Sequence, residues 1–243
     1  SAGDMTTLGR GGSDTTAAAL GAALGAEVVE IYTDVTGIMS ADPNIVPEAK
    51  WQDSMTYTEL IEMANLGAKV VHLQAVEIAM HSRTPLVIRS TFSDEAGTVV
   101  TDMAGKRTAP FAALRPVTAV ATTARRAQLI VEGGNLNVFS AMATNGVSVD
   151  MINVFPDRVA FIVAMQDLPV ARRVITGLGY DVGVVEGCAK VSIVGEGMRG
   201  TPGIMARLAT ALAEAGVAIL QTSDSHYSIS CLVREEQLEL AAR

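Results

Sequence analysis

Asn145-Gly146-Val147-Ser148-Val149 recurs further along the chain as Ala215-Gly216-Val217-Ala218-Ile219. The two copies share one pattern of residue types, and their central glycines stand 70 positions apart (216 minus 146). A period of this length is too long for a solenoid repeat and fits a duplicated small domain. The recurring stretch therefore predicts that the second half of the chain consists of two related units.

The segments around each copy follow the order βαββαβ, the pattern of a ferredoxin-like unit. In the first unit we expect strands at 127–132, 147–154 and 159–165 and helices at 135–144 and 170–178. In the second we expect strands at 190–194, 217–222 and 227–233 and helices at 203–214 and from 235 onward. The chain ends before a closing strand of the second unit is expected.

The first part of the chain, residues 1–108, alternates helix-like and strand-like segments, which predicts a mostly parallel sheet with helices on its faces. A helix over 17–24 is apolar all round, so it should be buried, and Ser13 or Asp14 can cap it. Thr56 and Glu59 form a capping-box pattern before a helix that ends at Gly67. The remaining expected elements are strands 27–33 and 85–90, a helix 69–80 and a linker 97–115.

Charge and composition exclude several classes of partner. The formal net charge is −8, which disfavours nucleic acid and anionic membranes. No apolar stretch is long enough to span a bilayer, and the first residues do not resemble a signal peptide. Cys188 and Cys231 have no metal-ligand spacing, which favours reduced thiols in a cytoplasmic protein. His72 and His81 stand nine residues apart without a third ligand nearby, so no metal site is expected.

Gly9-Arg10-Gly11-Gly12-Ser13-Asp14 is the sharpest local signal for chemistry. Adjacent glycines let a ligand approach the backbone, and a helix that starts there points free N–H groups at an anion. Arg10 adds a two-pronged donor for a carboxylate or phosphate, whereas Asp14 would orient a cation or a reacting group. An ordinary glycine turn with a helix cap is the alternative interpretation.

Two further segments are candidates for the same site. Thr33-Asp34 ends a predicted strand, and ligands collect at the carboxyl ends of strands in open α/β sheets. Lys69 follows Gly67-Ala68 near a helix start, where its ammonium could reach a phosphate. A strand-end turn and a solvated surface lysine are the respective alternatives.

Together with Thr6-Thr7-Leu8 before the first loop, Glu30 to Pro43, and Gly67-Ala68-Lys69-Val70-Val71-His72, these motifs resemble aspartate kinases in order and spacing. The resemblance implies a partial three-layer α/β/α amino-acid-kinase domain, followed by two ACT domains at 125–187 and at 116–124 with 188–243. It implies phosphorylation of L-aspartate to 4-phospho-L-aspartate with ATP and its Mg²⁺, and feedback regulation in the lysine, threonine and methionine pathway.

The same resemblance implies the roles of individual residues. Asp14 would be catalytic, and aspartate would be bound by Arg10, Gly11, Gly12 and Ser13. ATP would be bound by Thr33, Asp34, Met39, Asn44, Lys69 and Val70. Met39, Asn44 and Leu73 depart from the family pattern, which often has an aromatic, a basic residue and a proline there. The family's N-terminal glycine loop and phosphate-handling lysine should precede residue 1, so we expect this chain alone to be inactive.

ACT domains pair across a dimer and bind amino-acid effectors, which implies a homodimer or higher assembly. The implied effector residues are Gly134, Asn135, Asp150 and Asn153 in the first unit and Met198, Gly203, Asp224, Ser225 and His226 in the second. Lysine, threonine and diaminopimelate all stay open as effectors. A non-catalytic regulatory subunit that binds an amino acid and a catalytic partner is the alternative function, and an unrelated amino-acid kinase would not explain the ACT repeat.

Overall fold

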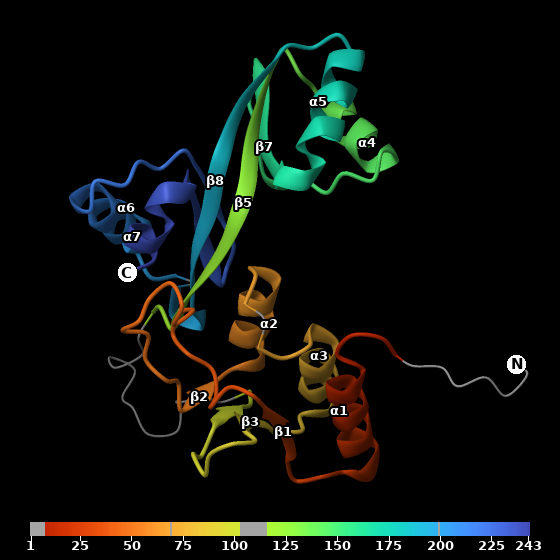
Figure 1. The fold of residues 1–243 in the computed structure, drawn as a ribbon, viewed down its shortest axis with the longest axis vertical. Coiled ribbons are helices and arrows are strands. Elements are labelled where there is room, and N and C mark those ends of the chain that lie inside the picture. The colour runs from red at the N-terminus through yellow and green to blue at the C-terminus, as the bar shows by residue number, and fades with distance from the viewer. Residues whose placement is uncertain (1–7, 69, 103–115, 199) are drawn as a thin grey trace, which may run out of the picture. The chain divides into compact units, whose positions relative to one another are not determined.

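The computed structural model describes residues 8–68, 70–102, 116–198 and 200–243 (Figure 1). The chain divides into two compact units. The first comprises Ser1–Ala121, Ile193–Pro202 and His226–Ser228, and the second comprises Thr122–Ser192, Gly203–Ser225 and Ile229–Arg243. Two loops late in the sequence therefore fold with the N-terminal segment.

The first unit contains a four-stranded sheet with the order β1-β3-β4-β2. The parallel pair β1 (Val29–Thr33) and β3 (Leu86–Ser90) matches the predicted strands, with Thr33 opposite Ser90. The short strands β2 (Ser54–Met55) and β4 (Thr98–Val100) were not predicted, because two or three residues leave no periodic signal. Strand β4 runs antiparallel to β3 and parallel to β2, so the sheet is mixed.

Helices α1 (Gly12–Leu24), α2 (Tyr57–Asn65) and α3 (Leu73–Ser82) belong to the first unit. The predicted capping box at the start of α2 is confirmed: Thr56 Oγ1 accepts from Glu59 N at 3.1 Å, and Glu59 Oε2 accepts from Thr56 N at 3.0 Å. Gly67 follows the end of α2 with φ of 115°. Helix α3 starts later than residue 69, with His72 as its N-cap.

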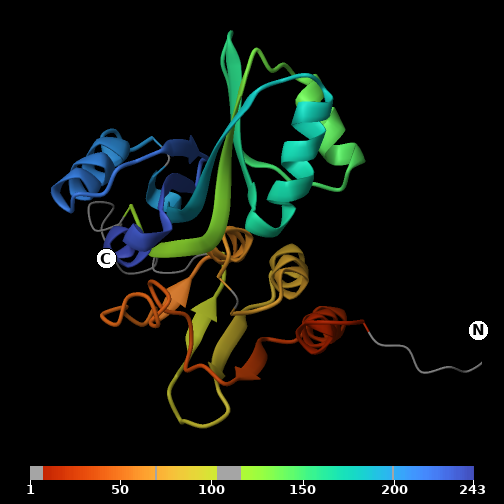
Figure 2. The ribbon, with the colours of Figure 1, turned by 45° about the horizontal axis from the view of Figure 1, so that its top comes forward.

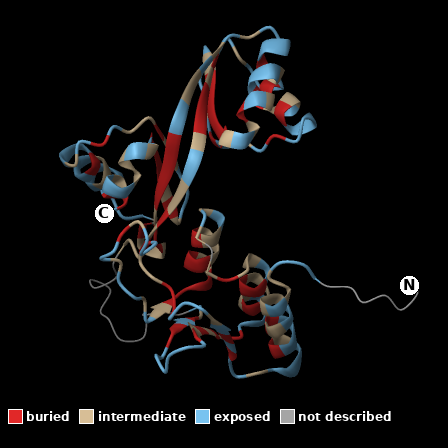
Figure 3. Cartoon of the chain, in the orientation of Figure 1, coloured by how far each residue is buried: buried red, intermediate tan, exposed pale blue. Residues whose placement is uncertain are grey.

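The prediction that the helix after the glycine loop is buried all round is wrong for the described chain. Only Ala18 and Gly21 of α1 are buried, whereas Leu20 and Leu24 are 57% and 80% exposed. Gly21 lies against the side chain of Val29 in β1, so the side of α1 with small residues packs on the sheet. The opposite side of α1 is exposed, as Figure 3 shows.

Most of the second unit is built on a six-stranded sheet with the order β6-β7-β5-β8-β10-β9 (Figure 2). The six strands are β5 (Ala119–Glu132), β6 (Asp150–Val154), β7 (Arg158–Ala164), β8 (Val182–Val194), β9 (Gln221–Asp224) and β10 (Ser228–Arg234). The helices are α4 (Asn137–Thr144), α5 (Leu168–Gly177), α6 (Ile204–Glu214) and α7 (Leu238–Ala242), with short 3-10 turns at Met165–Asp167, Glu196–Met198 and Glu235–Gln237.

The two βαββαβ repeats share their central strands. The strand expected at 127–132 is continuous with residues from the segment 116–124, and together they form β5, in which Arg125 adopts a φ of 58°. Strand β8 pairs with β5 along the middle of the sheet. The first repeat uses β5, β7, β6 and β8, and the second uses β8, β10, β9 and β5.

The middle strand of each repeat starts later than predicted. Residues 147–149 and 217–220 form no strand, although Val147 and Val217 are buried. The N–H of Val147 donates to Met142 O at 3.0 Å and that of Val217 to Leu212 O at 2.8 Å, so both bonds close the preceding helix after its glycine. These N–H groups are therefore not available to a strand ladder.

Candidate functional site

The glycine loop forms the start of α1. Gly9 and Gly11 adopt left-handed conformations with φ of 80° and 71°, which a residue without a Cβ tolerates. Gly11, not Ser13 or Asp14, is the N-cap, so the predicted cap is wrong. Ser13 and Asp14 lie within the first turn, where Ser13 Oγ donates to Asp14 Oδ1 at 3.2 Å. No side chain of the described residues caps α1, which leaves its first turn to face a ligand.

Helix α3 places a second N-terminus next to this loop. The N–H of His72, the N-cap of α3, donates to Asp14 Oδ2 at 3.4 Å. The His72 ring packs against Gly11, where an added Cβ would overlap it. Its Nδ1 is buried with no hydrogen-bond partner in the described part of the chain. The Asp14 carboxylate thus accepts hydrogen bonds both from its own turn and from the N-terminus of α3.

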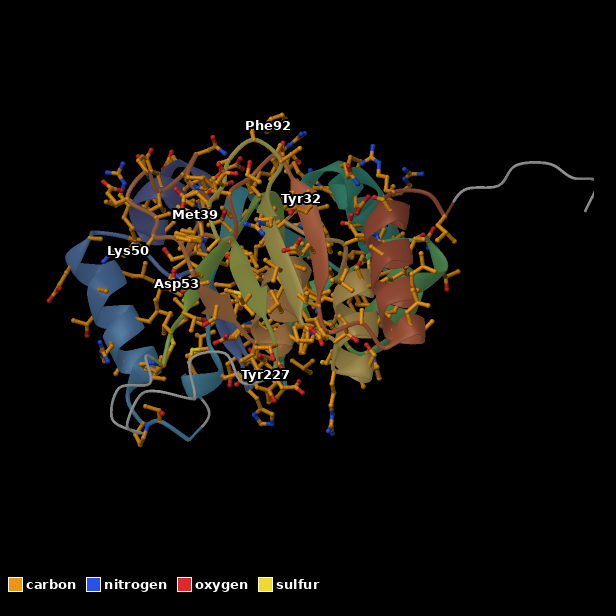
Figure 4. The ribbon with its side chains drawn as sticks, turned by 90° about the horizontal axis from the view of Figure 1, so that it is seen from below. Tyr32, Met39, Lys50, Asp53, Phe92 and Tyr227 are labelled. Carbon is orange, nitrogen blue, oxygen red and sulfur yellow. The ribbon has the colours of Figure 1, made fainter. Side chains whose placement is uncertain are left out.

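The sheet brings Thr33 and Asp34 to the same edge. Helix α1 precedes β1 and packs on it, so its N-terminus lies toward the carboxyl end of β1. Helix α3 packs on α1, and the hydrogen bond from His72 to Asp14 places its N-terminus at the same end. Tyr32 and Phe92 mark this edge in Figure 4. Thr33 Oγ1 donates to Asp34 Oδ1 at 3.0 Å, and Asp34 is exposed. The loop, the Thr33-Asp34 pair and Val70 therefore share one edge, as expected for a ligand site.

The other residues expected to bind ATP follow β1 in the sequence. Met39 forms an isolated bridge with Trp51, and Asn44 donates from both its backbone N and its side-chain Nδ2 to Asp42 Oδ1 at 2.9 Å. Figure 4 shows Met39 with Lys50 and Asp53 to one side of the sheet. Lys69 lies outside the described residues. The amide of Asn44 is thus already engaged within its own turn.

In the first repeat, two effector candidates join a polar cluster. Asp150 Oδ2 forms an ion pair with Lys190 Nζ, and its Oδ1 accepts from Met151 N at 2.7 Å. Asn153 Oδ1 accepts from Gln221 Nε2 at 2.6 Å. The Lys190 side chain is 8% exposed and that of Asp150 is 52% exposed, so a buried cation holds a carboxylate that solvent can reach.

Gln221 joins the two repeats within this cluster. Its Nε2 also contacts Met151 O, and its Oε1 accepts from Gln128 Nε2 at 2.9 Å. Gln221 stands 70 positions after Met151 (221 minus 151), so equivalent positions of the repeats meet. Sequence reasoning missed Lys190, Gln221 and Gln128. The sequence showed only that each of them lies in a predicted strand.

The other effector candidates have simpler surroundings. Asn135 Nδ2 donates to Tyr180 Oη at 3.1 Å, and Gly134 follows β5 in the same loop. Gly203 is the N-cap of α6 with φ of 86°. Among the remaining candidates Met198 and His226 fold with the first unit, and Asp224 and Ser225 fold with the second.

Burial controls the titration of three side chains. It raises the pKa of Tyr57 to about 12, with a smaller contribution from Asp102, and the Tyr57 hydroxyl donates to Thr84 O at 2.7 Å. Burial likewise raises the pKa of Cys231 to about 11 and raises that of Cys188. Both thiols are free and buried, so neither is an activated nucleophile.

The described residues contain neither a metal-binding cluster nor a membrane-spanning helix. No cluster of three or more His, Cys, Asp or Glu side chains could hold a metal ion. No helix there has the length and apolar character to cross a membrane.

Two family models match the chain. Residues 1–90 match the amino acid kinase family, and residues 183–243 match an ACT domain. The fold and these matches thus define an amino-acid-kinase segment followed by an ACT segment.

Similarity to known proteins identifies the kind of amino acid kinase. Aspartokinase 1 of Bacillus subtilis is 44% identical over 242 residues, which cover 97% of this chain and 60% of the relative. The crystal structure of Clostridium acetobutylicum aspartate kinase is 27% identical with a TM-score of 0.88, and the match covers 99% of this chain and 58% of that one.

E. coli aspartokinase III is similar in two solved states. Its complex with aspartate and ADP is 29% identical, and its complex with lysine and aspartate is 30% identical, both with a TM-score of 0.77. These matches cover 98% of this chain and 56% and 55% of the solved chains. The chain belongs to the aspartate kinases and spans about 60% of the length of the curated relatives that it matches.

Proposed function

We propose that the polypeptide to which this chain belongs phosphorylates the side-chain carboxylate of L-aspartate with ATP. The observation that carries this proposal is the meeting of the glycine loop, the α3 N-terminus and Thr33-Asp34 at one sheet edge. The similarity to E. coli aspartokinase III, solved with aspartate and ADP, supports the choice of substrates.

In the proposed reaction, a carboxylate oxygen of aspartate forms a bond to the γ-phosphorus of ATP. The bond from that phosphorus to the oxygen that bridges to the β-phosphate breaks, and ADP leaves. Such transfers depend mainly on positioning and on placed positive charge. The product is 4-phospho-L-aspartate.

The described residues fit the aspartate half of this reaction. Arg10 is exposed at the loop and can bind a carboxylate with two parallel hydrogen bonds. Gly11 and Gly12 carry no side chain that would obstruct a ligand, and the α1 N-terminus favours an anion. Ser13 can donate to the substrate, and Asp14 would organise the transfer near the reacting groups.

For the nucleotide half, we assign Thr33, Asp34, Met39, Asn44, Lys69 and Val70 to the ATP site. Mg²⁺ would enter with the nucleotide and neutralise charge on the transferring phosphoryl group. Because the described residues form no metal cluster of their own, the phosphate oxygens would supply most of its ligands.

The test is an assay of the complete polypeptide with ATP, Mg²⁺ and L-aspartate, in which aspartyl phosphate is trapped with hydroxylamine and ADP is measured in parallel. We expect aspartate-dependent formation of both products, and a higher KM for aspartate in Arg10→Gln. Arg83→Gln, an exposed arginine after α3, is the matched control. The 243-residue chain alone is expected to be inactive. ADP formation that does not depend on aspartate would refute the assignment.

We also propose that the repeats bind an amino-acid effector, with lysine, threonine and diaminopimelate as the candidates, and that they mediate a homodimer. E. coli aspartokinase III has been solved with lysine, which supports an amino-acid effector. In the first repeat, the accessible Asp150 carboxylate could pair with the ammonium group of such a ligand. The other assigned residues are Gly134, Asn135, Asn153, Met198, Gly203, Asp224, Ser225 and His226.

Thermal shift and inhibition assays with each of the three amino acids would test this regulation, and light scattering would give the assembly state. We expect one effector to raise Tm and to inhibit, and Asp150→Asn to weaken both effects. Binding of an amino acid by a complete polypeptide that forms no aspartyl phosphate would instead favour a non-catalytic regulatory protein.

A further inference from the structure

His72 occupies the gap between the two helix N-termini of the candidate site. It is the N-cap of α3, in an extended conformation with φ of −69° and ψ of 129°. A Cβ added at Gly11 would lie 2.5 Å from the Cβ of His72 and closer still to its ring. The ring therefore fills the space beside Gly11 and leaves no room there for a larger residue.

The backbone of His72 acts on the other end of the loop. Its N–H donates to Asp14 Oδ2, while Ser13 Oγ donates to Asp14 Oδ1. These two donors give the carboxylate a defined orientation at the edge of the sheet. One residue of α3 thus contacts both Gly11 and Asp14, the first and last residues of the turn that starts α1.

The support behind His72 is rigid. Ala18 of α1 and Ala75 and Ala79 of α3 are fully buried or nearly so and belong to one core cluster, so the helices approach closely through small side chains. Because Nδ1 of His72 has no partner among the described residues, packing against Gly11 sets the position of the ring.

We propose that His72 is a positioning residue of the aspartate-binding loop. Its ring keeps Gly11 in the left-handed turn, and its N–H orients Asp14, so that the loop is preorganised for aspartate before ATP binds. This inference rests on the proposed function of the loop. It assigns to His72 no contact with the reacting atoms.

The experiment uses the complete polypeptide and measures kcat and both KM values for His72→Ala and His72→Leu. We expect His72→Ala to raise the KM for aspartate by about tenfold or more while the KM for ATP stays within about twofold. His72→Leu keeps bulk beside Gly11, so its KM for aspartate should lie between those of the wild type and the alanine variant. His81→Ala changes an exposed histidine at the other end of α3 and should change neither KM.

A double-mutant cycle isolates the contact itself. Gly11→Ala should impair kcat/KM for aspartate through both the strained φ and the overlap with His72. His72→Ala removes the overlap with the ring and leaves only the strained φ and the contact with Cβ, so the combined loss should fall short of the product of the single losses by about threefold or more.

Several outcomes would overturn the inference. These are an unchanged KM for aspartate in His72→Ala, an equal rise in both KM values, a leucine variant as impaired as the alanine variant, or strictly multiplicative losses in the cycle. A wild-type polypeptide that forms no aspartyl phosphate would instead refute the proposed function, and the inference with it. Aspartate kinase activity with unaltered His72→Ala kinetics would refute the inference alone.

Discussion

The buried side chain of Glu59 accepts two hydrogen bonds that stabilise different parts of the first unit, and replacing it tests how much they contribute to stability. Its Oε2 accepts from Thr56 N at 3.0 Å in the capping box of α2. Its Oε1 accepts from Glu196 N at 3.3 Å, which ties the late loop Ile193–Pro202 to α2. The substitution Glu59→Ala leaves both donors without this carboxylate.

The expected loss of stability follows from these contacts. A hydrogen bond to a charged group contributes about 1.5–3 kcal/mol, and the longer bond to Glu196 belongs at the low end. We therefore expect Glu59→Ala to cost about 3 kcal/mol, and Thr56→Ala, which removes only the N-cap oxygen, to cost about 1 kcal/mol. Because the two residues share the capping box, the double variant should cost less than the sum.

Trp51 provides the assay. It is the only tryptophan in the sequence and lies in the first unit, so its fluorescence during urea unfolding reports this unit without the second. With a slope of about 2 kcal/mol per molar urea, the midpoint should fall by about 1.5 M in Glu59→Ala. Glu48→Ala removes an exposed carboxylate as the control and should leave the midpoint unchanged. A midpoint shift for Glu59→Ala no larger than that for Thr56→Ala would refute a stabilising role for the hydrogen bond from Glu196 to Glu59.

Three further predictions concern buried polar groups. Asp150→Ala should destabilise the second unit by about 3 kcal/mol because it leaves the buried Lys190 ammonium without its ion-pair partner, whereas Lys190→Met should cost less. Hydrogen exchange in β8 would compare the two variants, and equal losses of stability would contradict the argument. Because the pKa of Tyr57 is raised, its contribution to the free energy of unfolding is complete below pH 10 and is lost as pH rises towards 12. In Tyr57→Phe, the stability measured by Trp51 fluorescence should therefore fall less between pH 10 and 12 than in the wild type. Cys231 should react with iodoacetamide at pH 8 only after unfolding, and rapid labelling of the native chain would refute its burial.

Local sequence signals predicted most of the regular elements. The capping box of Thr56 and Glu59 correctly marked the start of α2, since the motif needs only residues three apart. The repeated glycines Gly146 and Gly216 marked the duplicated unit, because each closes a helix in a left-handed conformation. The strands that begin at Asp150 and Gln221 were predicted to start too early, because the N–H groups of Val147 and Val217 close the preceding helices instead of joining a strand ladder.

The sequence drew attention to the residues of the glycine loop, whose role in the candidate site stays a prediction, and not to the residues that support them. Gly11 and Asp14 stood out because glycine pairs and a carboxylate at a helix start are visible in sequence. His72 was visible as part of a motif, but its supporting role was not predicted, because its contact with Gly11 joins residues 61 positions apart (72 minus 11) and depends on how α1 packs on α3. The polar links of Gln221 to Gln128 and Asn153 were invisible for the same reason.

The sequence by itself determined the order of the longer elements, the duplication of the βαββαβ unit and the family resemblance, because these rest on short-range periodicity and on motifs that are complete within a few residues. Only the tertiary structure decided that β5 and β8 are shared by both repeats, that the loops Ile193–Pro202 and His226–Ser228 fold with the first unit, and that His72 lies against Gly11. The physical reason is that strand pairing and helix packing are settled by contacts between residues far apart in the chain, which no local pattern encodes.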